Sequence, residues 1–183
     1  MDIKLISQER AEDLNMPNEA FELFGKLNVQ RLDQQWDYSI HYFEESKWDV
    51  FPDESYDWQQ VMTQGFALGA YVDEQLLGLA IFQDDWKKFM YLHDLKVTQA
   101  FRKNGVAAEL IKKGHELALE RGYRGIYTIG QDNNLAACRF YLKQGFLIGG
   151  FNDWDYRYTQ QANKADIYFY LDQSPAKPKE RTV

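Results

Sequence analysis

The chain has 183 residues, of which 45% are hydrophobic and 16% aromatic, so its length and composition suit one folded domain with a sizeable core. Its net charge is -7, from 28 acidic and 21 basic residues, which argues against nucleic acid as a partner. The single cysteine excludes an internal disulfide, and no run of 18 apolar residues is available to span a membrane. Because the N-terminus also lacks the apolar core of a signal peptide, we expect a cytoplasmic protein.

The N-terminal part of the chain predicts a short strand followed by two helices. Residues 3–6 favour the strand. Asn18 is placed to cap a helix in which Phe21, Phe24 and Leu27 follow at helical spacing. The second helix is predicted over residues 36–43.

Residues 36–58 mix aromatic rings with carboxylates. One interpretation is a wall that receives an ammonium group through cation–π contacts and carboxylate pairing. The other is a set of ordinary core rings with solvated acids between them. The side chains concerned are Trp36, Asp37, Tyr38, Tyr42, Trp48, Asp49, Phe51, Asp53, Glu54, Tyr56, Asp57 and Trp58.

The middle of the chain predicts three consecutive antiparallel strands. Residues 66–72 and 76–82 form a hairpin because only a short polar turn separates them. The third strand covers residues 91–97. A helix over residues 106–121, ended by a glycine, then returns the chain. This right-handed crossover places strand 126–130 parallel to the third strand.

A basic glycine turn of the form R-x-x-G-x-A joins the third strand to this helix. The first N–H groups of a helix have no backbone partner and lie at the positive end of its dipole, so an anion is favoured there. Gly105 and Ala107 are small, and Arg102 and Lys103 add positive charge. The other interpretation is a plain strand-to-helix turn with solvated basic residues.

The C-terminal part continues with a helix and two strands. Residues 131–134 are a polar cluster suited to cap a helix over residues 135–144, and Gly145 ends that helix. The last strands are predicted over residues 146–154 and 166–171.

Three of these features together resemble the GCN5-related N-acetyltransferase (GNAT) family. They are the strand Tyr-Leu-His-Asp-Leu-Lys-Val at 91–97, the turn at 102–107, and the run Asn-Leu-Ala-Ala-Cys-Arg-Phe-Tyr-Leu-Lys-Gln-Gly-Phe at 134–146. The last run and the Leu-Ile-Gly-Gly at 147–150 look most like the streptothricin acetyltransferase branch of that family.

The resemblance implies a mixed α/β fold of the α+β type. Its central sheet would be mixed and mostly antiparallel, with flanking helices and with the fourth and fifth strands splayed apart. A single N-acetyltransferase domain would cover residues 1–172, followed by a polar tail, 173–183, that we expect to be mobile. The resemblance also implies acetyl-CoA as cosubstrate, no metal, and a homodimer, because family members often dimerise.

The family's motifs also imply site residues. Its general acid is the tyrosine of a Phe-Tyr pair, which matches Tyr141, and a phenol there can protonate the leaving thiolate. In the family the pantetheine arm pairs with the fourth strand, whose backbone N–H, here that of Leu95, faces the developing oxyanion. Asn134 matches an asparagine that contacts the pantetheine region, and it also suits a helix cap. The implied cofactor-binding residues are Leu95, Lys96, Val97, Arg102, Lys103, Asn104, Gly105, Val106, Ala107 and Asn134.

The general base is left open between two neighbours. Polyamine acetyltransferases of the family often carry, at the position of His93, a glutamate thought to act through water. An imidazole titrates near neutrality and suits the same role, whereas the other interpretation is a histidine that only forms hydrogen bonds. Asp94 is the alternative base. Strand alternation predicts two sets of side chains on opposite faces, Tyr91, His93, Leu95 and Val97, and Leu92, Asp94 and Lys96.

These features predict an acetyl-CoA-dependent N-acetyltransferase acting on a primary amine of a small cationic molecule, such as a streptothricin-like antibiotic. Polyamines or peptide amines are the alternative acceptors, and a non-catalytic acetyl-CoA-binding regulatory module is the alternative class. The G-G-x-D-x-x-L-Y pattern of the branch is met only in part, because Asn152 and Asp155 replace its aspartate and leucine. If that strand contacts the acceptor, these positions predict a different amine.

Overall fold

A seven-stranded sheet forms the centre of the fold in the computed structural model, which describes residues 1–173. Its order is β1-β4-β5-β6-β7-β9-β8, and every neighbouring pair is antiparallel except β6 and β7, which are parallel. The predicted mixed, mostly antiparallel sheet is confirmed. The strands are β1 (Asp2–Leu5), β4 (Gly65–Val72), β5 (Gln75–Gln83), β6 (Phe89–Val97), β7 (Gly125–Gln131), β8 (Leu147–Asn152) and β9 (Asp166–Asp172).

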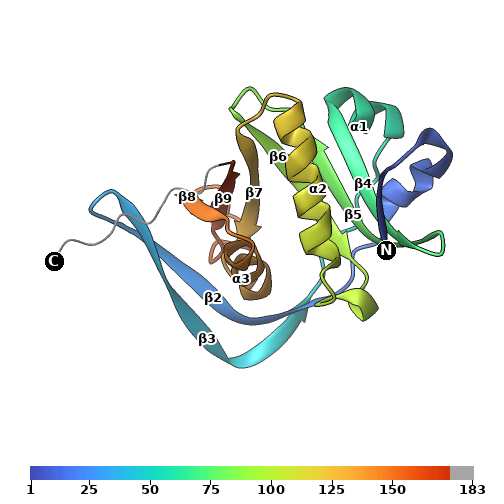
Figure 1. Cartoon of the computed structure of the whole chain (residues 1–183). Helices are drawn as coiled ribbons and strands as arrows, with labels where there is room; N and C mark the ends of the chain where they lie inside the picture. Colours follow the sequence, from blue (N-terminus) through green and yellow to red (C-terminus); the bar gives the residue numbers. More distant parts are fainter. Residues whose placement is uncertain (174–183) are drawn as a thin grey trace.

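Two helices, α2 (Val106–Glu120) and α3 (Leu135–Lys143), pack on one face of this sheet (Figure 1). The apolar side of α2 predicted from its helical spacing is the side that is buried. Gly122 follows α2 with a φ of 89°, the left-handed conformation predicted for it. The main core includes Met90, Leu92, Val106, Leu110, Ile111, Ile126, Leu135, Ile167 and Phe169.

Two further short helices cover β4 and β5 on the other face, and neither was predicted. They are the 3₁₀ helix η1 (Gln8–Asn15) and α1 (Trp58–Gln64). Asp57 caps α1 by accepting a hydrogen bond from the N–H of Gln60 at 2.8 Å. A second, smaller core is formed by Ile6, Leu14, Val61, Ala67, Leu79 and Ile81.

A long hairpin, β2 (Phe21–Leu32) and β3 (Gln35–Asp49), replaces the two helices predicted for this segment. Both of those helix predictions are wrong. Asp33 and Gln34 between the strands have φ values of 47° and 64°, which are typical of a type I′ hairpin turn. Figure 1 shows the hairpin curving beneath α3 and extending past β8 and β9.

The strands themselves explain the error. The pairing is interrupted between Leu23 and Gly25, which lets both Phe24 and Leu27 pack against the main core and imitates helical spacing. From Trp36 onward, β3 alternates apolar and polar side chains for several residues, which is the two-residue period of a strand. The segment is a strand because it pairs with β3, although the spacing of Phe21, Phe24 and Leu27 is that of a helix.

Replacing Gly114 of α2 by alanine is expected to destabilise the fold by about 1–3 kcal/mol. A Cβ at this position would lie 2.0 Å from Cζ of Phe82, which is fully buried and stacks on Phe66 with a ring separation of 4.9 Å. Urea denaturation followed by circular dichroism would measure the loss. The exposed neighbour Lys112 provides the control, because its alanine variant should change stability by less than about 0.5 kcal/mol. Equal stability of both variants would contradict the expectation.

Within residues 1–173, none of the helices combines the length and the apolar character needed to cross a bilayer. The tail predicted over residues 173–183 lies, except for Gln173, outside the described residues.

Candidate active site

Strands β6 and β7 are the fourth and fifth strands of the main sheet, and they are paired over only a short stretch. Just beyond the last pair, the hydroxyl of Thr128 on β7 donates a hydrogen bond to the carbonyl of Leu92 on β6 at 2.9 Å. Beyond these residues β6 and β7 form no further pairs with each other, so they diverge, and the predicted splay is confirmed. The paired residues are Phe89 with Gly125, Met90 with Ile126, and Tyr91 with Tyr127.

A β-bulge at His93 changes which side chains of β6 share a face. Consecutive residues of β5 pair with Asp94 and Leu92, so His93 has no partner on β5. The extra residue shifts the alternation by one, and the predicted grouping of Leu92 with Asp94 is wrong. The observed sets are Met90, Leu92, Leu95 and Val97 toward the main core, and Tyr91, His93, Asp94 and Lys96 away from it.

Tyr141 lies on the helix side of the splay. Its ring packs against Phe146 and Phe169, with centroid distances of 5.4 Å to each, and it is 9% exposed. A Cβ built on Gly130 would lie 3.7 Å from this ring, which places the ring against β7. Burial raises the pKa of the Tyr141 phenol, and the neighbouring Thr128 offsets this only in part. The phenol therefore stays protonated at neutral pH and is available as a proton donor.

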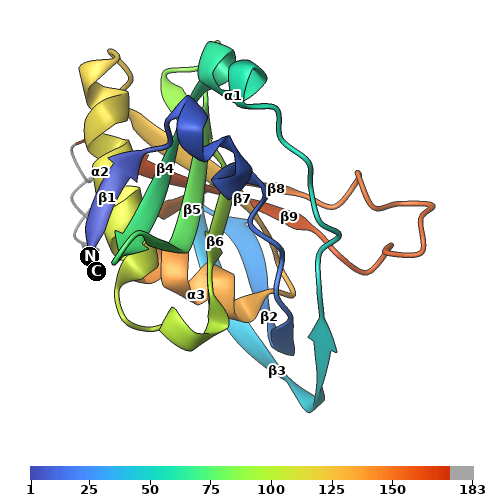
Figure 2. The same cartoon turned by 90° about the vertical axis from the view of Figure 1, so that its right-hand side faces the viewer.

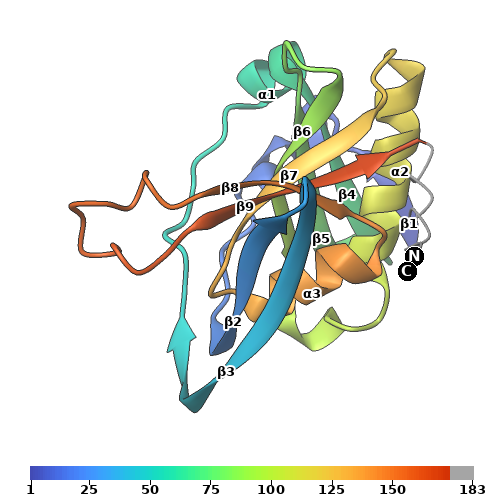
Figure 3. The ribbon, with the colours of Figure 1, turned by 90° about the vertical axis from the view of Figure 1, so that its left-hand side faces the viewer.

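The opposite side of β6, β7 and β9 carries a row of aromatic rings. Tyr91 stacks on Tyr127 at 4.9 Å, and Tyr127 stacks on Tyr170 at 5.5 Å. Figures 2 and 3 show the segments 50–57 and 153–165 projecting on the side of the sheet away from α2. We call this surface the tyrosine face, and it consists of Tyr91, His93, Asp94, Lys96, Tyr127, Gln131, Asp166, Tyr168 and Tyr170.

His93 is the exposed member of the tyrosine face nearest the splay. Its ring makes edge contacts with Tyr91 at 5.4 Å and Tyr56 at 5.9 Å. No hydrogen bond or ion pair within residues 1–173 engages its ring nitrogens, so they are available to water or to a bound amine. The bulge directs the side chain outward at the point where β6 and β7 separate.

Asp94 is held in a network of ion pairs. Its Oδ2 atom accepts a hydrogen bond from the Tyr56 hydroxyl at 3.1 Å and lies 3.1 Å from Nζ of Lys96. The same Nζ lies 2.6 Å from Glu54 and donates to the carbonyl of Met16. Burial raises the pKa of Asp94, and Lys96 opposes this only in part. The side chain of Lys96 thus holds the Glu54 segment over β6, which leaves only its backbone for the predicted cofactor contact.

The turn before α2 has the conformation that an anion site needs. Gly105 has a φ of 84°, which favours glycine, and it begins α2 without a side-chain cap on the first N–H groups. Lys103 beside it is exposed. Arg102 instead turns inward, donating to the carbonyls of Val97 at 3.1 Å and Ala20 at 2.9 Å. The turn therefore presents backbone amides outward, and Arg102 fixes it to the start of β2.

Asn134 lies at the start of α3, on the far side of the splay from the turn. Its side chain accepts a hydrogen bond from the N–H of Ala137 at 3.1 Å, so it caps the helix. Its backbone forms an isolated bridge with Gly25 of β2, which brings the hairpin alongside the site. Leu95 and Val97 direct their side chains into the main core, which leaves their backbone at the edge of the splay.

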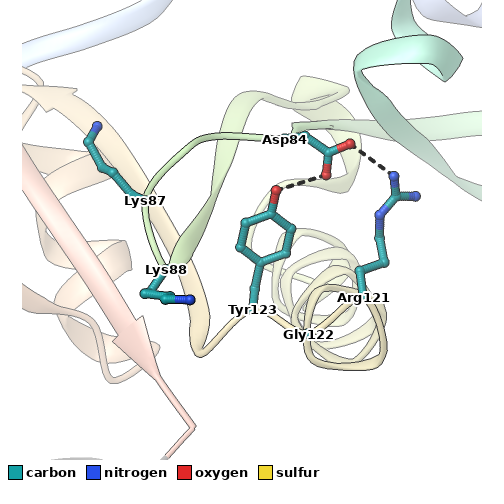
Figure 4. Close-up of a pocket in the computed structure, with 6 residues that line it drawn as sticks. All are labelled: Asp84, Lys87, Lys88, Arg121, Gly122 and Tyr123. Carbon is teal, nitrogen blue, oxygen red and sulfur yellow. Dashed lines mark hydrogen bonds and ion pairs between the residues drawn. The ribbon is translucent and has the colours of Figure 1, made fainter.

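A hollow of about 290 Å³ at the other end of α2 is separate from this site (Figure 4). Asp84 there accepts hydrogen bonds from Tyr123 and Arg121, both at 3.0 Å. The hollow lies at the C-terminal end of α2, one helix length or about 22 Å from the turn. Its polar groups thus stabilise the end of α2. Its lining residues are Asp84, Lys87, Lys88, Arg121, Gly122 and Tyr123.

Several residues of the site were not identified from the sequence. Tyr56 and Glu54 appeared only as members of a long aromatic and acidic segment, and Asp166 and Tyr156 were not singled out for chemistry. Their partners on β6 and β7 lie 25 to 42 positions away along the chain, and strand alternation alone does not connect them. Within the described residues, no group of three or more His, Cys, Asp or Glu side chains is placed to hold a metal ion.

The similar proteins found by sequence and by structure include several that carry the name streptothricin acetyltransferase. The streptothricin acetyltransferase A of Bacillus subtilis (strain 168) is 29% identical over 160 residues, covering 87% of this chain and 92% of that protein. An Escherichia coli streptothricin acetyltransferase is 29% identical over 171 residues, covering 93% and 95%. A crystal structure of a Bacillus anthracis str. Ames protein, assigned as a streptothricin acetyltransferase and solved with acetyl coenzyme A, shares the fold. Its TM-score is 0.84 at 23% identity, covering 93% of this chain and 98% of that one.

The family itself is decided by a direct match. The sequence profile described as the Acetyltransferase (GNAT) family matches residues 30–146, which is well over half of the chain. This region contains the splayed strands, the glycine turn and the helix of Tyr141. The resemblance drawn from the three motifs is confirmed, and the chain belongs to the GNAT family of acetyltransferases.

Proposed function

We propose that the enzyme transfers the acetyl group of acetyl-CoA to a primary amine of a small cationic molecule. The observation that carries this proposal is the placement of Tyr141 and His93 on opposite sides of the splay. A thioester held between β6 and β7 would meet a proton donor on the helix side. On the tyrosine face it would meet an amine beside a proton acceptor.

The residues bordering the splay fit the chemistry of acetyl-CoA. The uncapped N–H groups of α2 and the positive end of its dipole suit the pyrophosphate, and Lys103 adds positive charge. The backbone from Leu95 to Val97 suits the pantetheine arm, and the N–H of Leu95 is our candidate donor to the developing oxyanion. Ala107, in the first turn of α2, and Asn134, at the start of α3, are proposed to contact the cofactor as well.

Two side chains move protons in this proposal. His93 accepts a proton from the acceptor amine, directly or through a water, because no hydrogen bond or ion pair of residues 1–173 engages its ring nitrogens. Tyr141 donates its proton to the departing sulfur. Asp94 is less suited as the base, because Tyr56 and Lys96 both occupy its Oδ2 atom.

Transfer is direct, without an acetylated cysteine. The one thiol of the chain, Cys138, is buried in α3 close to Tyr141. Burial raises the pKa of Cys138 to about 12, and its Sγ atom donates to the carbonyl of Gln131 at 3.3 Å. A thiol that is almost entirely protonated at neutral pH is a poor nucleophile.

The acceptor is proposed to be cationic because carboxylates and rings border His93. Asp94 and Glu54 lie on one side, and stacked tyrosines lie on the other. Since the relatives are named for streptothricin, an amine of a streptothricin-like antibiotic is the first candidate. A polyamine is the second. Asn152 supports an acceptor other than that of the branch, because this side chain closes its own turn by accepting from the N–H of Trp154 at 2.9 Å and does not supply the branch's aspartate.

Mass spectrometry of streptothricin after incubation with the enzyme and acetyl-CoA tests the proposal. We expect a gain of one acetyl group and release of one equivalent of CoA thiol. Polyamines and peptide amines are assayed in parallel by thiol release. Failure to acetylate any of these amines, in a sample in which acetyl-CoA binding is confirmed by calorimetry, would overturn the proposed function.

A further inference from the structure

A second tyrosine–carboxylate pair lies at the end of β7 and β9. The hydroxyl of Tyr156 donates to Oδ1 of Asp166 at 2.8 Å, and Nε2 of Gln131 donates to the same Tyr156 oxygen at 3.1 Å. Gln131 and Asp166 are direct partners in the β7–β9 register. The arrangement repeats that of Tyr56 and Asp94 on β6, so two oriented carboxylates border the tyrosine face.

Strand alternation places Asp166 on the tyrosine face. Ile167 and Phe169 point into the main core, so Asp166, Tyr168 and Tyr170 point to the opposite side. Burial is the main cause that raises the pKa of Tyr91, and the carboxylates of Asp166 and Asp94 raise it further, which is consistent with both facing that phenol. The two acids therefore border one surface that includes His93.

Asp166 differs from Asp94 in whether a cationic side chain pairs with its carboxylate. Asp94 pairs with the ammonium of Lys96, whereas Asp166 forms no ion pair with any lysine, arginine or histidine of residues 1–173. The nearest lysine in sequence, Lys164, instead donates to Gln131 and lies 3.6 Å from Asp49. Asp166 is half-buried, and burial raises its pKa. The hydrogen bond from Tyr156 opposes this rise, and the nearby carboxylates of Asp155 and Asp132 add to it.

We propose that Asp166, oriented by Tyr156 and Gln131, binds a second cationic group of the acceptor while the reacting amine lies at His93. This inference rests on the proposed function and adds to it the substrate class of amines with two separated ammonium or guanidinium groups. Strand β7 lies between the two positions, which puts them about 10 Å apart across the strands in a regular sheet. Asp166 also lies about two residues further along the strands than His93, and β6 and β7 diverge here, so the separation is at least about 12 Å. A short diamine does not span this distance, so the second ammonium can reach Asp166 only in chains of about eight carbons or more.

Thiol release with α,ω-diaminoalkanes of increasing length measures the effect, with the amino alcohol of the same length as the monocationic partner. The wild-type enzyme is expected to prefer diaminooctane over aminooctanol by about 10- to 100-fold in kcat/KM, the value of a hydrogen bond between charged groups. Asp166→Asn should remove this preference by raising KM for the diamine, while the rate with aminooctanol is retained. Tyr156→Phe should reduce the preference in part, because the carboxylate stays but loses its orientation.

Asp153→Asn is the matched control, because Asp153 lies in the loop that carries Tyr156 and pairs with Arg157 at 3.1 Å on the surface. It should keep the wild-type preference. The retained rate of Asp166→Asn with aminooctanol shows that this variant is folded. A wild-type enzyme with no preference for the diamine, or an Asp166→Asn variant that keeps it, would overturn the inference and leave the proposed function intact. Absence of transfer to every amine by the wild-type enzyme would overturn both.

Discussion

Replacing Tyr141 by phenylalanine is expected to lower kcat by about 100- to 10,000-fold, the usual contribution of a general acid. The ring contacts with Phe146 and Phe169 do not involve the hydroxyl, so the variant should fold and keep its shape. The affinity for acetyl-CoA should change little, because the proposed binding contacts come from the turn before α2 and from the backbone of β6. Steady-state thiol release gives kcat, and calorimetry with CoA gives the affinity.

Tyr123→Phe is the matched control for this experiment. Tyr123 loses a hydroxyl of the same kind, but its partner is Asp84 at the far end of α2 (Figure 4). Its kcat should equal that of the wild type. If Tyr141→Phe turned over at the wild-type rate, Tyr141 would not be the acid. If it lost CoA affinity and kept kcat, the hydroxyl would serve binding.

The part of the fold around β6, α2 and β7 was predictable because each element carries a local signal. In α2 the apolar side chains recur with helical period, and Gly122 ends the helix. The polar turn between β4 and β5 contains Asp73 and Glu74, which adopt the positive φ values of a hairpin turn. Short-range rules therefore give most of the sheet, including the parallel crossover.

The hairpin and the details of the site depended on interactions that no local pattern contains. Whether Phe24 and Leu27 lie on a helix or a strand is decided by pairing with β3. The bulge at His93 is visible only once β5 and β6 are in register, and it changes the partners of Asp94. Tyr56 donates to Asp94, which lies 38 residues away in the sequence. The composition of residues 36–58 indicated an aromatic and acidic segment, but it could not predict this contact.

Replacing His93 by glutamine is expected to lower kcat/KM at neutral pH by about 100-fold or more. It should also flatten the acidic limb of the pH–rate profile. A general base works only when deprotonated, so kcat/KM of the wild type should be lower on the acidic side of the profile. Glutamine keeps the polarity and approximate size of the side chain but cannot accept the proton. Rate measurements from pH 5 to 9, with saturating acetyl-CoA, would show whether the limb disappears.

Two further variants decide between His93 and its neighbour. His41→Gln on β3 removes an exposed histidine of the hairpin and should leave the profile unchanged. Asp94→Asn should lower the rate, because Lys96 and Tyr56 lose their partner, but should keep the limb if His93 is the base. If Asp94 were the base, its buried carboxyl, whose pKa is raised, would place the limb above the usual aspartate range. The limb would then persist in His93→Gln and vanish in Asp94→Asn, which would transfer the proton-accepting role to the carboxylate that Lys96 now neutralises.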